Sequence, residues 1–344
     1  MSHLGQQHHH DDAWWRRLYA DDGATDPHGE PPVGSLDEHF ATVRRAFEGA
    51  PVRPPLPAQR PPEQVIHLGD RPPTYDAEPT AWPCADPDRL TDLVPDTVLD
   101  GAHYGRLTVR AASGRGDSAR YRGAPRTDAL LTARFGTGDD ALLFIAVAGG
   151  ARAADDAPRA ARDACHALGS AVGRNVPRLA EDIRSGQRGA LKSGLRRLTA
   201  RAYGKPHADG EPSAPCGEFV VSLRCLLLPV DPDCRTRVFF GLGPGGLFRL
   251  RAGQWQDLDP DAETEEAGTR FRFRASVAQR GETLLLCSAG LADPLRETPE
   301  LSEHLARRWG RADQPPGLAA FLADTATRVK GYADDRTAVA VWES

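Results

Sequence analysis

The sequence predicts an α+β sandwich with β-sheets inside and helices outside. Two observations predict it: strand-like apolar runs dominate the chain after about residue 100, and groups of amphipathic helices interrupt them twice. The order is strands, helices, strands, helices and a final strand, which suits two antiparallel sheets packed face to face beneath helices. With 344 residues, 40% of them hydrophobic, the chain can bury one sizeable core.

Residues 1 to about 100 differ from the rest of the chain. The stretch PVRPPLPAQRPPEQ at 51–64 favours extended polyproline conformations. Before it, Ser35 and Glu38 form a capping box that predicts a short helix at 36–48. We therefore predict a proline-rich, largely irregular extension over 1–100, which either folds back on the main domain or recruits a partner.

From about Gly105 the pattern becomes strand-like. Apolar runs bounded by glycine and aspartate predict strands at 105–113, 128–136 and 141–148. Apolar residues at helical spacing then predict helices that cover a sheet. Their stripes are Ala161, Cys165, Leu168 and Val172, then Leu179 and Ile183, then Leu191, Leu195, Leu198 and Ala202.

The second half of the chain repeats this organisation. Further antiparallel strands are predicted at 218–230, 237–243, 246–253, 270–277 and 282–290. The acidic segment at 257–268 predicts a surface loop between them. The chain closes with predicted helices at 301–309 and 317–329 and a last strand at 336–343.

Charge and composition exclude some classes of partner. The net charge of −5 leaves no basic footprint for nucleic acid. No apolar run approaches the roughly 18 residues of a membrane helix, and the amino terminus lacks the pattern of a secretory signal. We expect a cytoplasmic protein that binds neither nucleic acid nor a membrane.

Four polar motifs at strand ends resemble, in their order, those of the metal-dependent protein phosphatases of type 2C, in particular a bacterial branch. They are RGDSARYRGAPRTDA at 115–129, AVAGG at 146–150, ETLLLCSAGL at 282–291 and ADDRTAVAVW at 333–342. The resemblance implies that 105–344 is a type 2C phosphatase-like domain. Its fold would be a four-layer αββα sandwich of two antiparallel sheets flanked by helix pairs.

The same resemblance implies a metal site. Members of the family hold two Mn²⁺ or Mg²⁺ ions through aspartates and a glycine carbonyl, and the water between the ions attacks the phosphoester. On this chain the matching metal positions are Asp128, the carbonyl of Gly150 and Asp334. Hard divalent ions need oxygen ligands, and two ions close together need anionic side chains to offset their repulsion.

Two positions depart from the family's pattern. Gly149 stands where the family has the bridging aspartate, and Ala289 stands where it has a second metal aspartate. Two carboxylates and a carbonyl suit at most one weakly bound Mg²⁺ or Mn²⁺. Asp293, or the loop acids Asp155 and Asp156, are candidates for a compensating ligand.

Three functions remain open at this point. The first is a catalytically impaired phosphatase-like protein, or pseudophosphatase, that binds a phosphoprotein or another protein partner. The second is an active serine/threonine phosphatase that holds two Mn²⁺ or Mg²⁺ ions through rearranged ligands. The third is a scaffold that recruits a partner through the N-terminal extension. We assign no catalytic residue.

Overall fold

The computed structural model describes residues 67–72, 75, 81–150, 157–203, 221–259, 263–264, 270–310 and 315–344. All of them belong to one compact unit, Gln64–Ser344. The predicted helix at 36–48 and the proline-rich stretch at 51–64 lie outside the described residues. Among the helices that are described, none is long and apolar enough to cross a membrane.

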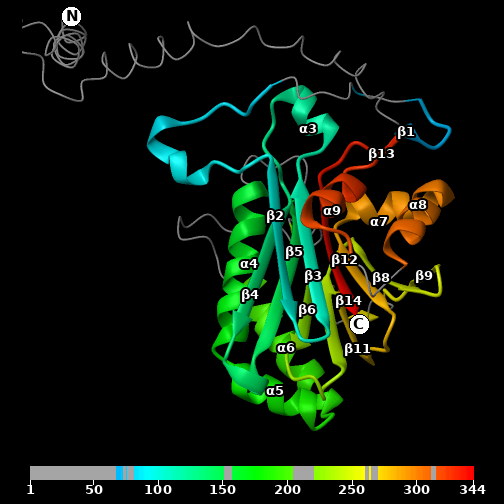
Figure 1. Ribbon diagram of the computed structural model, residues 1–344. Coiled ribbons are helices and arrows are strands. Elements are labelled where there is room, and N and C mark those ends of the chain that lie inside the picture. Colours follow the sequence, from blue (N-terminus) through cyan, green and yellow to red (C-terminus); the bar gives the residue numbers. More distant parts are fainter. Residues whose placement is uncertain are drawn as a thin grey trace, which may run out of the picture. The chain divides into compact units, whose positions relative to one another are not determined.

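One six-stranded antiparallel sheet has the order β10-β11-β7-β6-β5-β4 (Figure 1). Its strands are β4 (Ala129–Phe135), β5 (Leu142–Gly150), β6 (Val221–Pro229), β7 (Thr236–Leu242), β10 (Glu263–Thr264) and β11 (Arg270–Val277). In β5, Phe144 packs toward the helices and Ile145 packs toward the other sheet. Both faces of this strand are therefore buried, which explains its unbroken apolar sequence.

A second six-stranded antiparallel sheet has the order β2-β3-β14-β12-β8-β9. Its strands are β2 (Thr97–Tyr104), β3 (Leu107–Gly114), β8 (Gly246–Arg251), β9 (Gln254–Asp257), β12 (Thr283–Cys287) and β14 (Arg336–Glu343). Val339 and Val341 of β14 face the first sheet, and Trp342 faces the helices. The alternation follows from the two-residue period of a strand.

Helices cover the outer face of each sheet. Helices α4 (Ala157–Gly173), α5 (Val176–Arg184) and α6 (Arg188–Tyr203) pack on the first sheet. Helices α7 (Ala289–Glu297), α8 (Pro299–Trp309) and α9 (Leu318–Thr325) pack on the second. Three apolar clusters fill the spaces between the layers. The predicted α+β sandwich of four layers, αββα, is confirmed.

Smaller elements lie at the ends of the sandwich. Helix α3 (Asp117–Arg122) follows β3, and β1 (His67–Leu68) pairs in parallel with β13 (Arg328–Val329). Two 3₁₀ helices, η1 (Pro87–Asp92) and η2 (Gly138–Asp140), complete the described elements.

Several element boundaries differ from the sequence predictions. The predicted strand at 282–290 ends at Cys287, and α7 begins immediately after Ser288. This helix was missed because Pro294 lies inside it, whereas a proline usually ends a helical pattern. The predicted helix at 317–329 ends at Thr325, and the guanidinium of Arg336 donates to the carbonyl oxygens of Thr325 and Thr327 at this end.

Candidate functional site

A cavity of about 540 Å³ lies at the end of the sandwich where β5 ends and where α3 and α7 begin. We call it the carboxylate cavity. Its lining includes six of the positions that the sequence analysis singled out, namely Asp128, Gly149, Gly150, Ala289, Asp293 and Asp334. The described structure therefore brings all six predicted positions together.

Antiparallel pairing explains why these motifs meet. Ala148 near the end of β5 lies opposite Ala129 at the start of β4, so Gly149 lies close to Asp128. In the other sheet, Cys287 at the end of β12 lies opposite Ala338 near the start of β14. In each sheet, the end of one strand therefore lies beside the start of its neighbour. In both sheets these strand ends lie at the same cavity.

Asp128 is the buried centre of this site. This residue lies just before β4 and is 7% exposed. The hydroxyl of Thr337 donates to Asp128 Oδ2 at 2.9 Å, and it lies 2.6 Å from the hydroxyl of Ser113. Ser288 forms a further side-chain hydrogen bond with Asp128. These contacts hold the carboxyl group against the start of β14.

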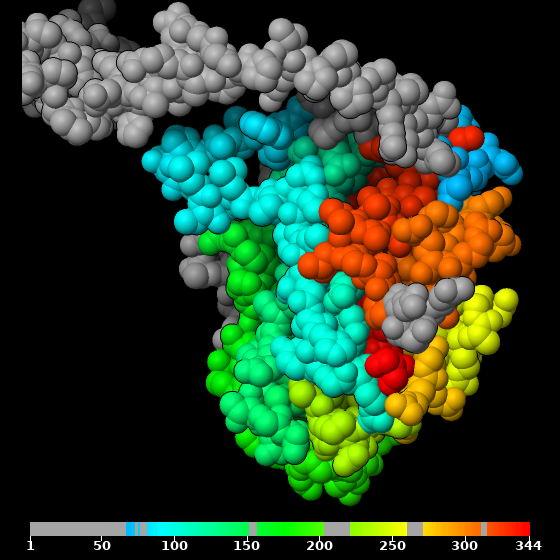
Figure 2. All heavy atoms as spheres, viewed as in Figure 1, coloured from blue at the N-terminus to red at the C-terminus, as the bar shows by residue number. Residues whose placement is uncertain are grey.

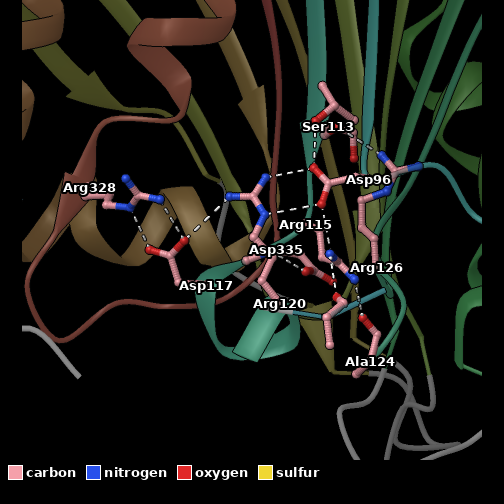
Figure 3. Close-up of polar contacts among 12 residues, drawn as sticks. Asp96, Ser113, Arg115, Asp117, Arg120, Ala124, Arg126, Arg328 and Asp335 are labelled. Carbon is pink, nitrogen blue, oxygen red and sulfur yellow. Dashed lines mark hydrogen bonds and ion pairs between the residues drawn. The ribbon is translucent and has the colours of Figure 1, made fainter. Parts of the chain in front are cut away.

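Burial and, to a smaller extent, the nearby charge of Asp335 raise the pKa of Asp128 to about 7. The hydrogen bonds from Ser288 and Thr337 and the charge of Arg126 act in the opposite direction. Arg126 is itself buried and donates to the backbone carbonyl of Ser113 at 3.1 Å (Figure 3). A guanidinium of this chain therefore offsets part of the negative charge of the site.

The Asp335 carboxylate accepts hydrogen bonds from neighbouring loops. Its Oδ1 accepts the backbone N–H of Gly116 at 2.7 Å, and its Oδ2 accepts the backbone N–H and the hydroxyl of Thr127 at 2.6 and 2.8 Å. Gly116 permits this close approach, because a Cβ there would stand 2.3 Å from the carbonyl carbon of Asp334. The Asp335 carboxylate ties the start of β14 to the loops around α3.

The two glycines at the end of β5 have different surroundings. A Cβ on Gly150 would lie 2.9 Å from the carbonyl oxygen of Ala157, so the packing of α4 requires glycine there. A Cβ on Gly149 would meet only side-chain atoms, at 2.9 Å from Ser222 Oγ and 3.2 Å from Asp128 Oδ1. A side chain at 149 would therefore point at Asp128, and the fold itself does not exclude one.

The remaining predicted acids line the same cavity but differ in how far they are exposed to solvent. Asp334 is partly buried. Asp293 lies on α7 with 51% of its side chain exposed, and its Oδ1 is 3.6 Å from Nη1 of Arg296. Ala289 is the first residue of α7 and brings no carboxylate to the cavity.

These residues do not fit a two-metal centre. Within the part of the chain that the structure describes, no group of three or more aspartate, glutamate, histidine or cysteine side chains is arranged to hold a metal ion. The Asp335 oxygens are occupied by backbone and hydroxyl donors. Asp155 and Asp156 lie outside the described residues.

Sequence reasoning missed the supporting polar residues. Ser113, Thr337 and Arg126 are buried, and their role depends on cross-strand neighbours such as the pair Ser113 and Thr337. A polar residue within the apolar run of β14 is the one local signal that Thr337 gives. Arg336 follows two aspartates in the sequence, yet its Nη1 donates to the backbone carbonyls of Thr325 and Thr327.

Comparison with known proteins agrees with this geometry. The chain belongs to the protein phosphatase 2C family: the family model for protein phosphatase 2C matches residues 115–325, more than half of the chain. No curated protein sequence matches it.

Solved structures of similar fold include three phosphatase-related proteins. RsbX, in a crystal structure with magnesium, is 12% identical, with a TM-score of 0.44 over 72% of this chain and 100% of that one. A SpoIIE fragment from Bacillus subtilis is 14% identical, with a TM-score of 0.46 over 72% of this chain and 70% of that one. The Mycobacterium tuberculosis serine/threonine phosphatase PstP is 20% identical, with a TM-score of 0.41 over 68% and 97%.

Proposed function

We propose that this protein is a pseudophosphatase of the 2C family, in which the carboxylate cavity binds a protein partner and does not support efficient phosphoester hydrolysis. The observation that carries the proposal is the position of Gly149. Its missing side chain would point at Asp128, where the family's bridging aspartate is expected, and Ala289 lacks the second carboxylate. Without them, two divalent ions would repel each other with too little compensating charge.

The charge of the cavity supports a protein ligand over a free phosphate. Its lining includes four aspartates, Asp128, Asp293, Asp334 and Asp335, and among the described lining residues Arg122 is the single cation. A phosphoryl group would be repelled by this lining unless a cation accompanied it. We propose that at most one Mg²⁺ or Mn²⁺ binds here weakly, held by Asp128, Asp334 and the carbonyl of Gly150. Such an ion would supply a charge that attracts a phosphorylated partner.

One observation favours a second candidate, an active phosphatase with rearranged ligands. Asp293 lines the same cavity as Asp128 and Asp334, and 51% of its side chain is exposed, so a change of rotamer away from Arg296 would bring its carboxylate toward an ion at this site. The third candidate, a scaffold that acts through residues 1–100, concerns a segment of which the structure describes only 67–72, 75 and 81–100, and it stays a prediction.

An assay of the full chain separates the first two candidates. We expect no Mn²⁺-stimulated hydrolysis of p-nitrophenyl phosphate or of phosphoserine and phosphothreonine peptides. Turnover at ordinary enzymatic rates, roughly 1 per second or faster, would contradict the proposal. If such turnover is lost in Asp293→Ala and kept in Asp257→Ala, a control that removes another partner of Arg296, the rearranged-ligand candidate is correct.

A further inference from the structure

A second cavity, of about 250 Å³, opens at the side of the sandwich between β2 and β4. We call it the edge pocket. Strand β4 is the edge of one sheet and β2 is the edge of the other. Figure 2 shows the cyan β2 beside the blue-green β4 on the visible face. The edge pocket and the carboxylate cavity have no described lining residue in common, so a ligand here is independent of the proposed function.

Cross-strand pairs show which side chains of β2 face the space between the sheets. Asp100 lies opposite Ala111, and Ala102 lies opposite Val109. Ala111 and Val109 belong to the apolar cluster between the two sheets. Residues directly opposite each other in an antiparallel pair lie on the same face of the sheet. Asp100 and Ala102 are therefore on the inner face of the edge strand.

The edge strand of the other sheet faces them with polar side chains. On β4, Thr132 lies opposite Ile145 and Arg134 lies opposite Leu143, and both partners belong to the same inner cluster. Thr132 and Arg134 are therefore also on an inner face. The hydroxyl of Thr132 donates to Oδ2 of Asp100, so this contact joins the two edge strands directly.

The floor of the edge pocket is apolar. Val109, Ala111, Leu143 and Ile145 line it, and each is at most 5% exposed. On the edge strand, Ala102 is too small to fill the space above them. The volume of about 250 Å³ exceeds the roughly 150 Å³ of an apolar cavity that accommodates benzene. It lies below the roughly 300 Å³ at which drug-sized ligand pockets begin. The space therefore suits a compact ligand with a short apolar group.

The mouth of the pocket carries one acid and one guanidinium, Asp100 and Arg134. Oδ1 of Asp100 accepts the backbone N–H of Gly101 at 2.7 Å, and Oδ2 accepts the Thr132 hydroxyl. Arg134 is exposed, and within the described part of the chain its guanidinium forms neither a hydrogen bond nor an ion pair. Neighbouring inward positions of a strand are roughly 6.6 Å apart, so Arg134 lies one such step from Thr132.

Inward-pointing charges on edge strands also prevent two sheets from pairing edge to edge. That role requires charge alone. It does not require a cavity behind the charges or an apolar floor beneath them. The combination of an acid, an unpaired guanidinium and an apolar floor therefore indicates a ligand that has both charges and an apolar group.

We propose that the edge pocket binds a free aliphatic α-amino acid, such as leucine. The carboxylate of the ligand binds Arg134, because a guanidinium donates two parallel hydrogen bonds to a carboxylate. Its ammonium group donates to Asp100, whose two oxygens accept about four hydrogen bonds and have two donors in the structure. The aliphatic side chain lies on the floor between the sheets, where its burial is favourable.

Titration calorimetry of the full chain with L-leucine tests the proposal. We expect saturable binding with a Kd of about 1 mM or below. Three probes each lack one part of leucine: glycine lacks the side chain, 4-methylpentanoate lacks the ammonium group and isoamylamine lacks the carboxylate. We expect each to bind at least tenfold more weakly, since each loses the apolar contact or a charge-assisted hydrogen bond. The absence of leucine binding, or a probe that binds as tightly as leucine, overturns the proposal.

Three variants locate the binding. Arg134→Gln and Asp100→Asn each remove one charge from the mouth, and we expect each to weaken leucine binding at least tenfold. The asparagine at 100 keeps an oxygen that accepts from Thr132. Ala102→Leu places a side chain over the floor and should abolish binding. If Ala102→Leu fails to fold by circular dichroism, Arg134→Gln carries the test, because Arg134 is exposed and makes no contact that the fold requires.

Arg184→Gln is the matched control for Arg134→Gln. Arg184 is also a surface arginine, but it pairs with Asp140 and Glu181 and does not line the edge pocket. We expect this variant to bind leucine as the wild type does. Equal loss of binding in Arg184→Gln and Arg134→Gln, or wild-type binding in Arg134→Gln, contradicts the assignment of leucine to this pocket.

Discussion

Replacing both Gly149 and Ala289 with aspartate is expected to create Mn²⁺ binding and Mn²⁺-dependent hydrolysis of p-nitrophenyl phosphate. A Cβ at 149 would stand 3.2 Å from Asp128 Oδ1, so the new carboxylate would begin beside the existing one once the Ser222 hydroxyl rotates away. Without a cation the two charges repel, and we expect the metal-free variant to be less stable than the wild type. Mn²⁺ at 100 times its Kd should then raise the free energy of unfolding by about 2.7 kcal/mol.

The matched control for this variant replaces the same two residues with asparagine. Asparagine has nearly the size of aspartate but carries no charge, so it tests the carboxylates separately from the space they fill. Thermal unfolding with and without Mn²⁺, together with the hydrolysis rate, provides the measurement. If the aspartate and asparagine variants respond equally to Mn²⁺, missing charge at these two positions is not what limits the site.

Asp128→Asn should change how stability depends on pH. Because the folded-state pKa of Asp128 is raised to about 7 from the ordinary 3.8, the folded protein binds this proton more tightly than the unfolded chain does. The stability from this group is fully present below about pH 4 and is lost as the pH rises through 7. Asparagine does not ionise, so the variant does not lose this stability as the pH rises. Between pH 5 and pH 8 its free energy of unfolding should gain about 2–3 kcal/mol relative to the wild type.

Urea unfolding at pH 5 and pH 8 measures this difference. Asp293→Asn is the matched control, because Asp293 lines the same cavity with 51% of its side chain exposed. We expect the difference between the control and the wild type to stay nearly constant across this pH range. A parallel pH dependence of the wild type and Asp128→Asn would show that Asp128 is already ionised at pH 5.

Periodicity predicted most of the sandwich because each element buries a regular stripe. The helical stripes from Ala161 to Leu195 all lie in the core, and the last strand runs over 336–343 as predicted. The sequence pattern missed an element where local signals conflict. Helix α7 buries Leu291, Ala292 and Leu295 at helical spacing, but its Pro294 is the residue that normally argues against a helix.

The sequence predicted which residues line the candidate site better than it predicted the hydrogen bonds among them. Asp128, Gly149 and Ala289, which the motifs singled out, line one cavity. The task of Asp335 depends on the backbone of Gly116 and Thr127, which are remote in sequence. No pattern within a short window encodes such contacts.

The central claim is that this chain holds too few carboxylates to keep two divalent ions together. Titration calorimetry of the wild-type protein with Mn²⁺, after dialysis against EDTA and then buffer, tests it most directly. We predict either no heat of binding or one weak site with a Kd in the millimolar range, about 4 kcal/mol of binding free energy. Two tight sites that are abolished by Asp128→Ala would contradict the claim.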